Sequence, residues 1–233
     1  MYKENVMNEF IKNFLKERLI ADVGFTKCED SPFSGLQNAV SLVVRLSDAV
    51  IDQIDNAPTH TYFQHYRTVN AYLDNVMLQL TMALQEKGYN AASVPASQSV
   101  EGLQGVYSHK KAAVQAGIGY IGKSCLFISK KYGPRVRLGT VFTDAPLETV
   151  NKKQESLCGD CNICATHCGA MAIKNVNYED GMTREEIFDA KACSDYMKEK
   201  YKHIGRGAVC GVCMRVCPRG NVKNAQSAKG EKK

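Results

Sequence analysis

Seven of the ten cysteines fall in two closely spaced runs, and an eighth lies between these runs. The first run, which begins at Cys158 and ends at Cys168, has the spacing C-x2-C-x2-C-x3-C. The second begins at Cys210 and has the spacing C-x2-C-x3-C-P. In two-cluster ferredoxins with the first spacing, three thiolates bind one [4Fe–4S] cube and the fourth binds the other. The cysteines therefore predict two [4Fe–4S] clusters.

The second run is one ligand short, because Gly207 stands where its first cysteine would fall. Of the three cysteines outside the runs, Cys193 is the nearest in sequence and lies between them. Eight thiolates then serve two cubes, and Cys28 and Cys125 remain without an assigned role. We predict that one cluster is held by Cys158, Cys161, Cys164 and Cys217, and the other by Cys168, Cys193, Cys210 and Cys213.

Two other uses of these cysteines fit the spacing less well. A structural zinc site would use two C-x2-C pairs or a mixture of Cys and His, rather than two interlocked runs with a trailing Cys-Pro. Disulfides would require an oxidising compartment. Gly169 follows Cys168 where this motif usually has proline, which alters one turn but not the ligand set.

Composition and charge indicate an ordinary globular protein. The chain has 233 residues and a net charge of +6. Its start has no basic-then-apolar signal region, and its apolar runs are too short to span a bilayer. Reduced cysteines in cluster spacing imply a reducing compartment, so we expect a cytoplasmic protein with no membrane partner. Part of the positive charge lies in residues 223–233, which we expect to form a disordered basic tail. Nucleic-acid binding is not indicated by so mild an excess.

Periodicity indicates an N-terminal α/β domain over residues 1–150 and a cluster domain over residues 151–222. A capping box from Thr183 to Glu186 predicts a short helix that leads to Cys193. We expect helices over residues 3–20, 59–87 and 109–116, and strands over residues 22–27, 39–46, 91–99, 125–129 and 136–143.

The segment Gly117–Lys123, followed by Ser124, matches two phosphate-loop patterns, G-x-x-x-x-G-K-S and G-x-G-x-x-G. Both patterns require a strand before the loop and a helix after it, so that helix-start N–H groups meet the phosphate. Here a helix-like segment precedes the loop and a strand-like segment follows it. We therefore do not expect nucleotide binding.

The order of these motifs resembles epoxyqueuosine reductase, a family related to the reductive dehalogenases. The resemblance is carried by His109–Lys123, Leu126–Ser129, Leu138–Leu147 and the two cysteine runs. It implies an α+β protein with an N-terminal α/β domain of cobalamin-processing or nitroreductase-like type, followed by a two-cluster [4Fe–4S] ferredoxin-like domain. It also implies a base-off cobalamin between the domains, reduced through the clusters to a cob(I)alamin-type nucleophile. The Gly117–Lys123 loop would then be a domain-packing or corrinoid-side element.

The sequence departs from this family in two places. The family has a catalytic acid in a V-D-S-A-P type motif, whereas the counterpart here, Ser93–Gln98, has no carboxylate. Protonation of an epoxide-derived oxygen needs a positioned acid. The family also continues into C-terminal helical repeats that help to hold tRNA, and this chain ends soon after Cys217. We therefore do not expect tRNA epoxyqueuosine to be the substrate.

These observations favour an iron–sulfur oxidoreductase that relays single electrons, from an external donor of ferredoxin or flavodoxin type, to a corrinoid or small substrate at the domain junction. Tyr66 and His109 are candidate proton donors, and Arg67 is a candidate anion ligand. The candidate cofactor-binding residues are His65, Arg67, Ser97 and Gln98.

Two alternatives stay open. The polar and aromatic residues near His65 fit better a helix end whose rings pack and whose polar tips are solvated. The chain could also be a non-catalytic electron carrier of ferredoxin type. A nucleic-acid-binding protein with structural clusters ranks last, since no basic stripe is evident.

Overall fold

The structure, a computed structural model, describes residues 2–98, 100–152 and 155–220. The chain divides into two compact units, and each is formed by separate stretches of sequence. The first unit consists of residues 1–45, 67–118 and 137–154, and the second of residues 46–66, 119–136 and 155–233. This division differs from the predicted boundary at residue 150, because two earlier segments pack with the cysteine region. The predicted tail, 223–233, lies outside the described residues.

The first unit contains a four-stranded sheet in the order β1-β2-β6-β3. Strand β1 (Asp22–Lys27) pairs antiparallel with β2 (Asn38–Arg45), and β3 (Ala91–Val94) pairs antiparallel with β6 (Val136–Thr143). Successive side chains of a strand point to opposite faces. Accordingly, Val40 and Leu42 pack into one apolar cluster and Ala39 packs into another.

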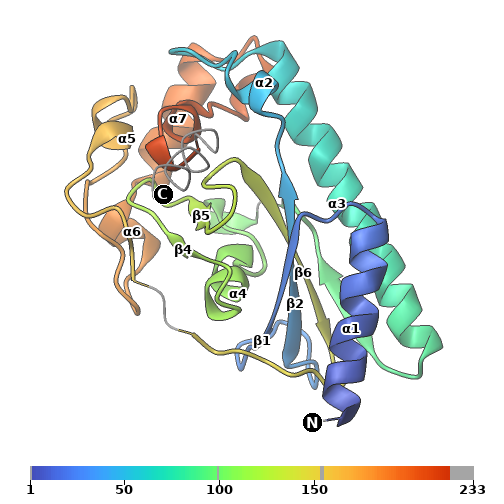
Figure 1. Cartoon of the computed structure of the whole chain (residues 1–233). Coiled ribbons are helices and arrows are strands. Elements are labelled where there is room, and N and C mark those ends of the chain that lie inside the picture. The colour runs from blue at the N-terminus through green and yellow to red at the C-terminus, as the bar shows by residue number, and fades with distance from the viewer. Residues whose placement is uncertain (1, 99, 153–154, 221–233) are drawn as a thin grey trace, which may run out of the picture. The chain divides into compact units, whose positions relative to one another are not determined.

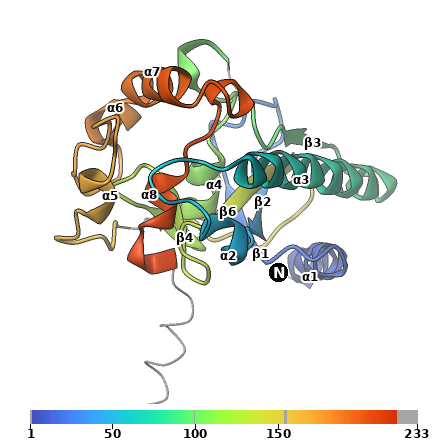
Figure 2. The ribbon, with the colours of Figure 1, turned by 90° about the horizontal axis from the view of Figure 1, so that it is seen from above.

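Helices cover both faces of this sheet (Figures 1 and 2). Helices α1 (Tyr2–Glu17) and α3 (His60–Glu86) lie on one face, where Ile11, Leu73 and Leu80 are fully buried. Helix α4 (His109–Gln115) lies on the other face and contacts β1 and β2. The apolar spacing in α1 and α3 is thus explained by burial of one stripe of each helix against the sheet.

The second unit is built from a hairpin and short helical turns. Strands β4 (Gly119–Ile121) and β5 (Phe127–Ser129) form an antiparallel pair. The helical elements are α2 (Asp48–Ile51), α5 (Ile163–Thr166), α6 (Arg184–Ile187), α7 (Ala190–Lys200), η2 (Gly205–Gly207), α8 (Val212–Arg215) and η3 (Pro218–Gly220). A further 3-10 turn, η1 (Glu101–Leu103), belongs to the first unit.

A buried charge ties the hairpin segment to α2 within the second unit. The Arg135 side chain is 2% exposed, and its guanidinium donates to Asp48 at 3.0 Å and to Asp52 at 2.8 Å. Buried arginines usually need such carboxylate partners. These ion pairs explain part of why residues 46–66 and 119–136 fold together rather than with the sheet.

Most predicted elements are confirmed, with shifts of a few residues at their ends. The strand expected over 91–99 is wrong beyond Val94, because Pro95 has no N–H to continue the ladder. Strand β4 is not among the predicted strands, because its three residues lie within Gly117–Lys123, which was interpreted only as a loop. The capping box is confirmed: the Thr183 backbone N–H donates to the Glu186 carboxylate at 2.7 Å.

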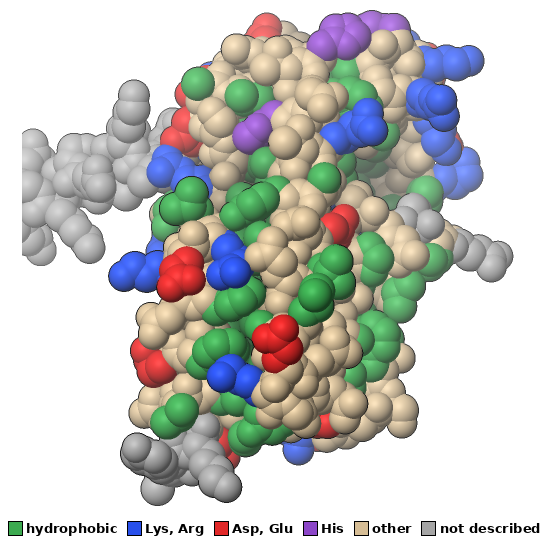
Figure 3. All heavy atoms as spheres, turned by 90° about the vertical axis from the view of Figure 1, so that its right-hand side faces the viewer, with side chains coloured by type: hydrophobic (Ala, Val, Ile, Leu, Met, Phe, Trp, Pro, Cys, Tyr) green, Lys and Arg blue, Asp and Glu red, His purple; other side chains and the backbone are tan. Residues whose placement is uncertain are grey.

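The described helices include none with the length and apolar character needed to cross a bilayer. Over α1 and α3, Figure 3 shows acidic, basic and apolar side chains interspersed rather than one continuous basic stripe.

Candidate iron–sulfur site

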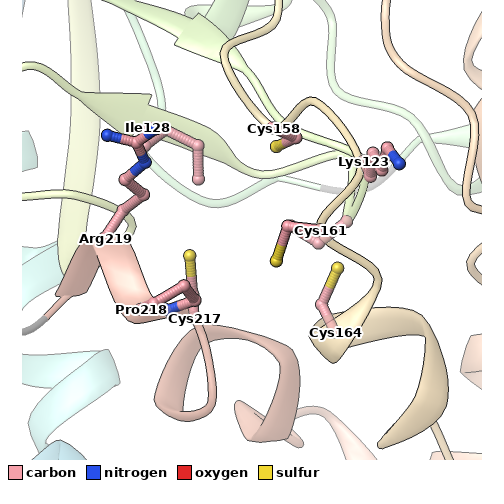
Figure 4. Close-up of a pocket in the computed structure, with 9 residues that line it drawn as sticks. Lys123, Ile128, Cys158, Cys161, Cys164, Cys217, Pro218 and Arg219 are labelled. Atoms are coloured by element: carbon pink, nitrogen blue, oxygen red, sulfur yellow. The ribbon is translucent and has the colours of Figure 1, made fainter.

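Four cysteines from both runs surround one cavity in the second unit. The sulfurs of Cys158, Cys161, Cys164 and Cys217 point toward one another across it (Figure 4). The cavity has a volume of about 380 Å³. Burial, followed by the neighbouring thiols of Cys158, Cys217 and Cys161, raises the pKa of Cys164 to about 11. Cys217 therefore lies with the first run, which is the arrangement expected when the second run lends a sulfur to the first cluster.

A second group of cysteines lies near the end of the first run. Burial, followed by the nearby thiols of Cys210 and Cys168, raises the pKa of Cys193 to about 11. Burial also raises the pKa of Cys213, and Cys210, Cys193, Cys164 and Cys168 raise it further. The structure thus brings together the four residues predicted to hold the second cluster.

Helix α7 supplies Cys193, and its packing explains why Gly207 cannot be a cysteine. A Cβ atom at Gly207 would lie 2.5 Å from the Met197 carbonyl oxygen and 2.7 Å from the Lys198 Cα atom. Gly207 also has a φ of +74°, which side chains rarely adopt. The backbone of α7 therefore fills the space of the missing ligand, while the same helix carries a replacement. Asp189 starts this helix by accepting the Ala192 N–H at 2.9 Å.

Gly169 has a similar steric role beside Cys168. A Cβ atom there would lie 2.4 Å from the Tyr196 hydroxyl oxygen. The residue that replaces the usual proline thus allows an α7 side chain to pack against the loop after Cys168. Between Cys210 and Cys213, a Cβ atom at Gly211 would lie 2.8 Å from Ile54 and Tyr62. Residues 46–66 therefore support the Cys210–Cys213 loop.

The Gly-rich loop lies beside the cavity rather than at a phosphate site. The segment follows α4, contains β4 and precedes β5, so the strand–loop–helix order of a phosphate loop is missing, as predicted. A Cβ atom at Gly122 would lie 3.4 Å from the Cys158 sulfur. Lys123 and Ser124 line the cavity with Arg219. Sequence reasoning missed these residues as neighbours of the cysteines, because no local signal pairs a hairpin with a distant loop.

The donor set fits a polynuclear cluster. All ten cysteines are free thiols, so the disulfide alternative has no support. Among the described residues, no three Cys, His, Asp or Glu side chains are grouped closely enough for a single metal ion. A tetrahedral zinc site would need such a group. Four sulfurs around a cavity, by contrast, suit a cube that occupies the space between them.

The residues predicted for proton transfer and cofactor binding are distributed over both units. His65 and Tyr66 belong to the second unit. The first unit contains the other candidates, which are Arg67, Ser97, Gln98 and His109. His65 accepts the Ser47 backbone N–H at 3.1 Å, and burial lowers its pKa. The Tyr66 ring lies 6.4 Å from that of Tyr62, which agrees with the packed helix end.

His109 has both ring nitrogens engaged inside the first unit. Nδ1 lies 2.8 Å from the Thr140 hydroxyl, and Nε2 lies 3.0 Å from the Pro95 carbonyl oxygen. Burial lowers the pKa of His109, so the neutral ring donates through Nε2 to Pro95 and accepts the Thr140 hydroxyl. This arrangement positions the loop after β3. Ser97 and Gln98 are exposed on that loop.

Comparison with known proteins points to one group of relatives. Residues 157–220 match the 4Fe-4S double cluster binding domain, and this range contains all eight assigned cysteines. Epoxyqueuosine reductase from Staphylococcus aureus is 30% identical over 124 residues, covering 52% of this chain and 32% of that protein. Tetrachloroethene reductive dehalogenase from Sulfurospirillum multivorans is 29% identical over 138 residues, covering 53% and 26%. The chain is thus similar to epoxyqueuosine reductase and to a reductive dehalogenase over about half of its length.

Solved structures show the same fold at low identity. A catabolic reductive dehalogenase in complex with 3-bromo-4-hydroxybenzoic acid has a TM-score of 0.70 at 18% identity, over 90% of this chain and 32% of that one. Selenomethionine-labelled epoxyqueuosine reductase has a TM-score of 0.58 at 19% identity, over 91% and 66%. This chain spans about a third or less of the two curated relatives named above. It has a mixed α/β fold and a domain for two [4Fe–4S] clusters.

Proposed function

We propose that this protein is an iron–sulfur oxidoreductase that relays single electrons to a corrinoid or a small substrate. The observation that carries the proposal is the convergence of Cys158, Cys161, Cys164 and Cys217 on one cavity. Cys217, from the far end of the cluster region, lines this cavity with three cysteines of the first run, as expected if the two runs share their ligands. When bound, the two clusters supply a path for one-electron transfer.

The chain's own residues define how this path would be held. Cys158, Cys161, Cys164 and Cys217 would bind one cluster, and Cys168, Cys193, Cys210 and Cys213 the other. Without iron, burial and mutual repulsion favour the protonated thiols, as the raised pKa values of Cys164 and Cys193 indicate. These thiols would have to release their protons to hold a cluster, because only the thiolate is a ligand.

The donor and the acceptor are proposed by chemical class. An external protein of ferredoxin or flavodoxin type would give up one electron in each transfer, so a two-electron reduction needs two transfers. A reducing compartment such as the cytoplasm suits free cluster-forming thiols. The corrinoid is suggested by a fold neighbour described as performing B12-dependent dehalogenation, and the first unit would then be the corrinoid-type domain. The Ser93–Gln98 segment has no carboxylate, so we do not propose epoxyqueuosine in tRNA as substrate.

Anaerobic purification followed by iron, sulfide and cobalt analysis tests this proposal. Two cubes of four irons predict about eight irons per chain, with reduced-state EPR signals from [4Fe–4S] clusters. Added cob(II)alamin should change its absorption spectrum when the reduced protein is present. One or two zinc ions per chain in place of iron would overturn the proposal.

The second candidate is a non-catalytic electron carrier. The observation that favours it is that His109 is committed to hydrogen bonds with Thr140 and Pro95, while the neighbouring loop has no acid. A carrier would contain both clusters and exchange electrons with a donor protein. It would leave the cob(II)alamin spectrum unchanged and would not contain cobalt after purification.

A further inference from the structure

Two cations line the cavity of the four cysteines, and they differ in burial. Lys123 enters from the loop between β4 and β5 and is 5% exposed. Arg219 follows Cys217 and is exposed, and its guanidinium donates to the Leu157 carbonyl oxygen at 3.1 Å. Figure 4 shows both residues beside the four cysteines, with their nitrogen atoms at the ends of the side chains that lie farther from the sulfurs. A buried ammonium is rare, because removing it from water is costly without a compensating partner.

The immediate partner of Lys123 does not compensate its charge. The ammonium donates to the Asn175 side-chain oxygen at 3.2 Å, which is a neutral acceptor. No Asp or Glu among the described residues forms an ion pair with Lys123. The negative groups that line the same cavity are the cysteine thiolates that a cluster would require. Lys123 is therefore a buried cation in the cavity wall with a neutral hydrogen-bond partner.

Electrostatics predicts the sign of the effect that a nearby cation has on a cluster's reduction potential. Reduction adds one negative charge to a cluster with four thiolate ligands, and no bond forms or breaks. A positive charge nearby stabilises the reduced state more than the oxidised one, and the effect is larger where water is excluded. Exposed charges have weaker effects because solvent and salt screen them.

We propose that Lys123 raises the reduction potential of the cluster held by Cys158, Cys161, Cys164 and Cys217, an inference that rests on the proposed electron relay. The electron comes from the external donor, which is oxidised by one electron as this cluster is reduced. Asn175 is the positioning residue, since it holds the ammonium. Asn175 has a φ of +61°, a conformation that asparagine adopts more readily than most residues.

A redox titration of the purified two-cluster protein, followed by EPR, tests the proposal. Lys123→Met removes the charge and keeps an unbranched apolar chain, so the midpoint potential of this cluster should become more negative. The potential of the other cluster should stay the same. Lys123→Arg should restore most of the original value. Asn175→Asp places a negative charge beside the intact ammonium and should shift the potential in the same direction as Lys123→Met.

Arg219→Met is the matched control, because it removes an exposed cation from the same cavity. Its shift should be smaller than that of Lys123→Met and should shrink as ionic strength rises. The proposal is overturned if Lys123→Met leaves the potential unchanged, or if both clusters shift equally. If Lys123→Met does not assemble clusters, the midpoint potential of Asn175→Asp tests the proposal by itself. An unchanged potential in that variant overturns the proposal. In either case, an iron content near that of the wild type would show that the protein still binds its clusters, so the proposed function would not be affected.

Discussion

The cysteine-lined cavity of the second unit and the polar cluster around His109 in the first use reactive side chains differently. In the cavity, four sulfurs point inward, and they come from two loops that are far apart in the sequence. Around His109, each ring nitrogen already has a protein partner, Thr140 or Pro95. Asp74 likewise accepts the Ala96 backbone N–H at 2.7 Å. Side chains that converge on an open space can bind a cofactor, whereas side chains that satisfy one another hold a loop in place.

The largest effect is expected from replacing Cys193, if the eight cysteines of the second unit are cluster ligands. Cys193→Ala should remove one of the two clusters and about half of the iron, since a cube with three thiolates is poorly held. Iron and sulfide analysis of the anaerobically purified variant measures this. Cys28→Ser is the control: Cys28 is buried and accepts the Tyr107 hydroxyl at 3.1 Å, away from both cysteine groups in the sequence. Equal iron in both variants would contradict the assignment of Cys193.

A substitution at Gly207 tests the steric account of the missing ligand. Gly207→Ala should destabilise the protein by about 2–4 kcal/mol, because it combines an unfavourable φ with overpacking against α7. Gly181→Ala isolates the backbone contribution, since Gly181 has a φ of +95° and no atom lies within 4 Å of the position that a Cβ would take there. That control should cost about 1 kcal/mol. Chemical unfolding of both variants gives the difference, and equal losses would show that packing against α7 is unimportant.

The smallest expected effect concerns pH and the first unit. Burial lowers the pKa of His109 in the folded state, so its neutral form stabilises the fold above the unfolded value of about 6.5. This contribution is lost as the pH falls from there toward the lowered folded pKa. His109→Gln should therefore lose less stability than the wild type between pH 7 and pH 5. Urea unfolding at both pH values measures the difference, with His65 unchanged in each protein. An unaltered pH dependence would mean that His109 is not a buried neutral ring.

Local patterns in the sequence were enough to predict α1, α3, α4, the short helix α6 and most strands, but not the helices α2, α5, α7 and α8 of the second unit. Apolar spacing in α1 and α3 reflects one buried stripe on each helix, and the alternation in β6 reflects its two covered faces. Spacing within the cysteine runs also has a local cause, since short loops must wrap a compact group of ligands. These features could be predicted because each depends on residues that are close together in the sequence.

Long-range packing set the limits of that prediction. The position of Lys123 beside the cysteines depends on how the β4–β5 hairpin packs within the second unit. Its motif matched phosphate-loop patterns, which the order of elements excluded, and gave no sign of the cysteines. His109 was predicted as a proton donor from its residue type, but its partners come from β6 and from the loop after β3. Neither partner is visible without the sheet. The role of Gly207 likewise depends on contact with the α7 backbone.

EPR and Mössbauer spectroscopy of Cys217→Ala, compared with Cys164→Ala, would test the shared-ligand arrangement most directly. These two residues lie in different cysteine runs but line the same cavity. Both variants should lose the same cluster and retain the signals of the other, which Cys193→Ala should lose instead. If Cys217→Ala lost the same cluster as Cys213→Ala and spared the one affected by Cys164→Ala, each run would hold its own cluster and the account would be wrong.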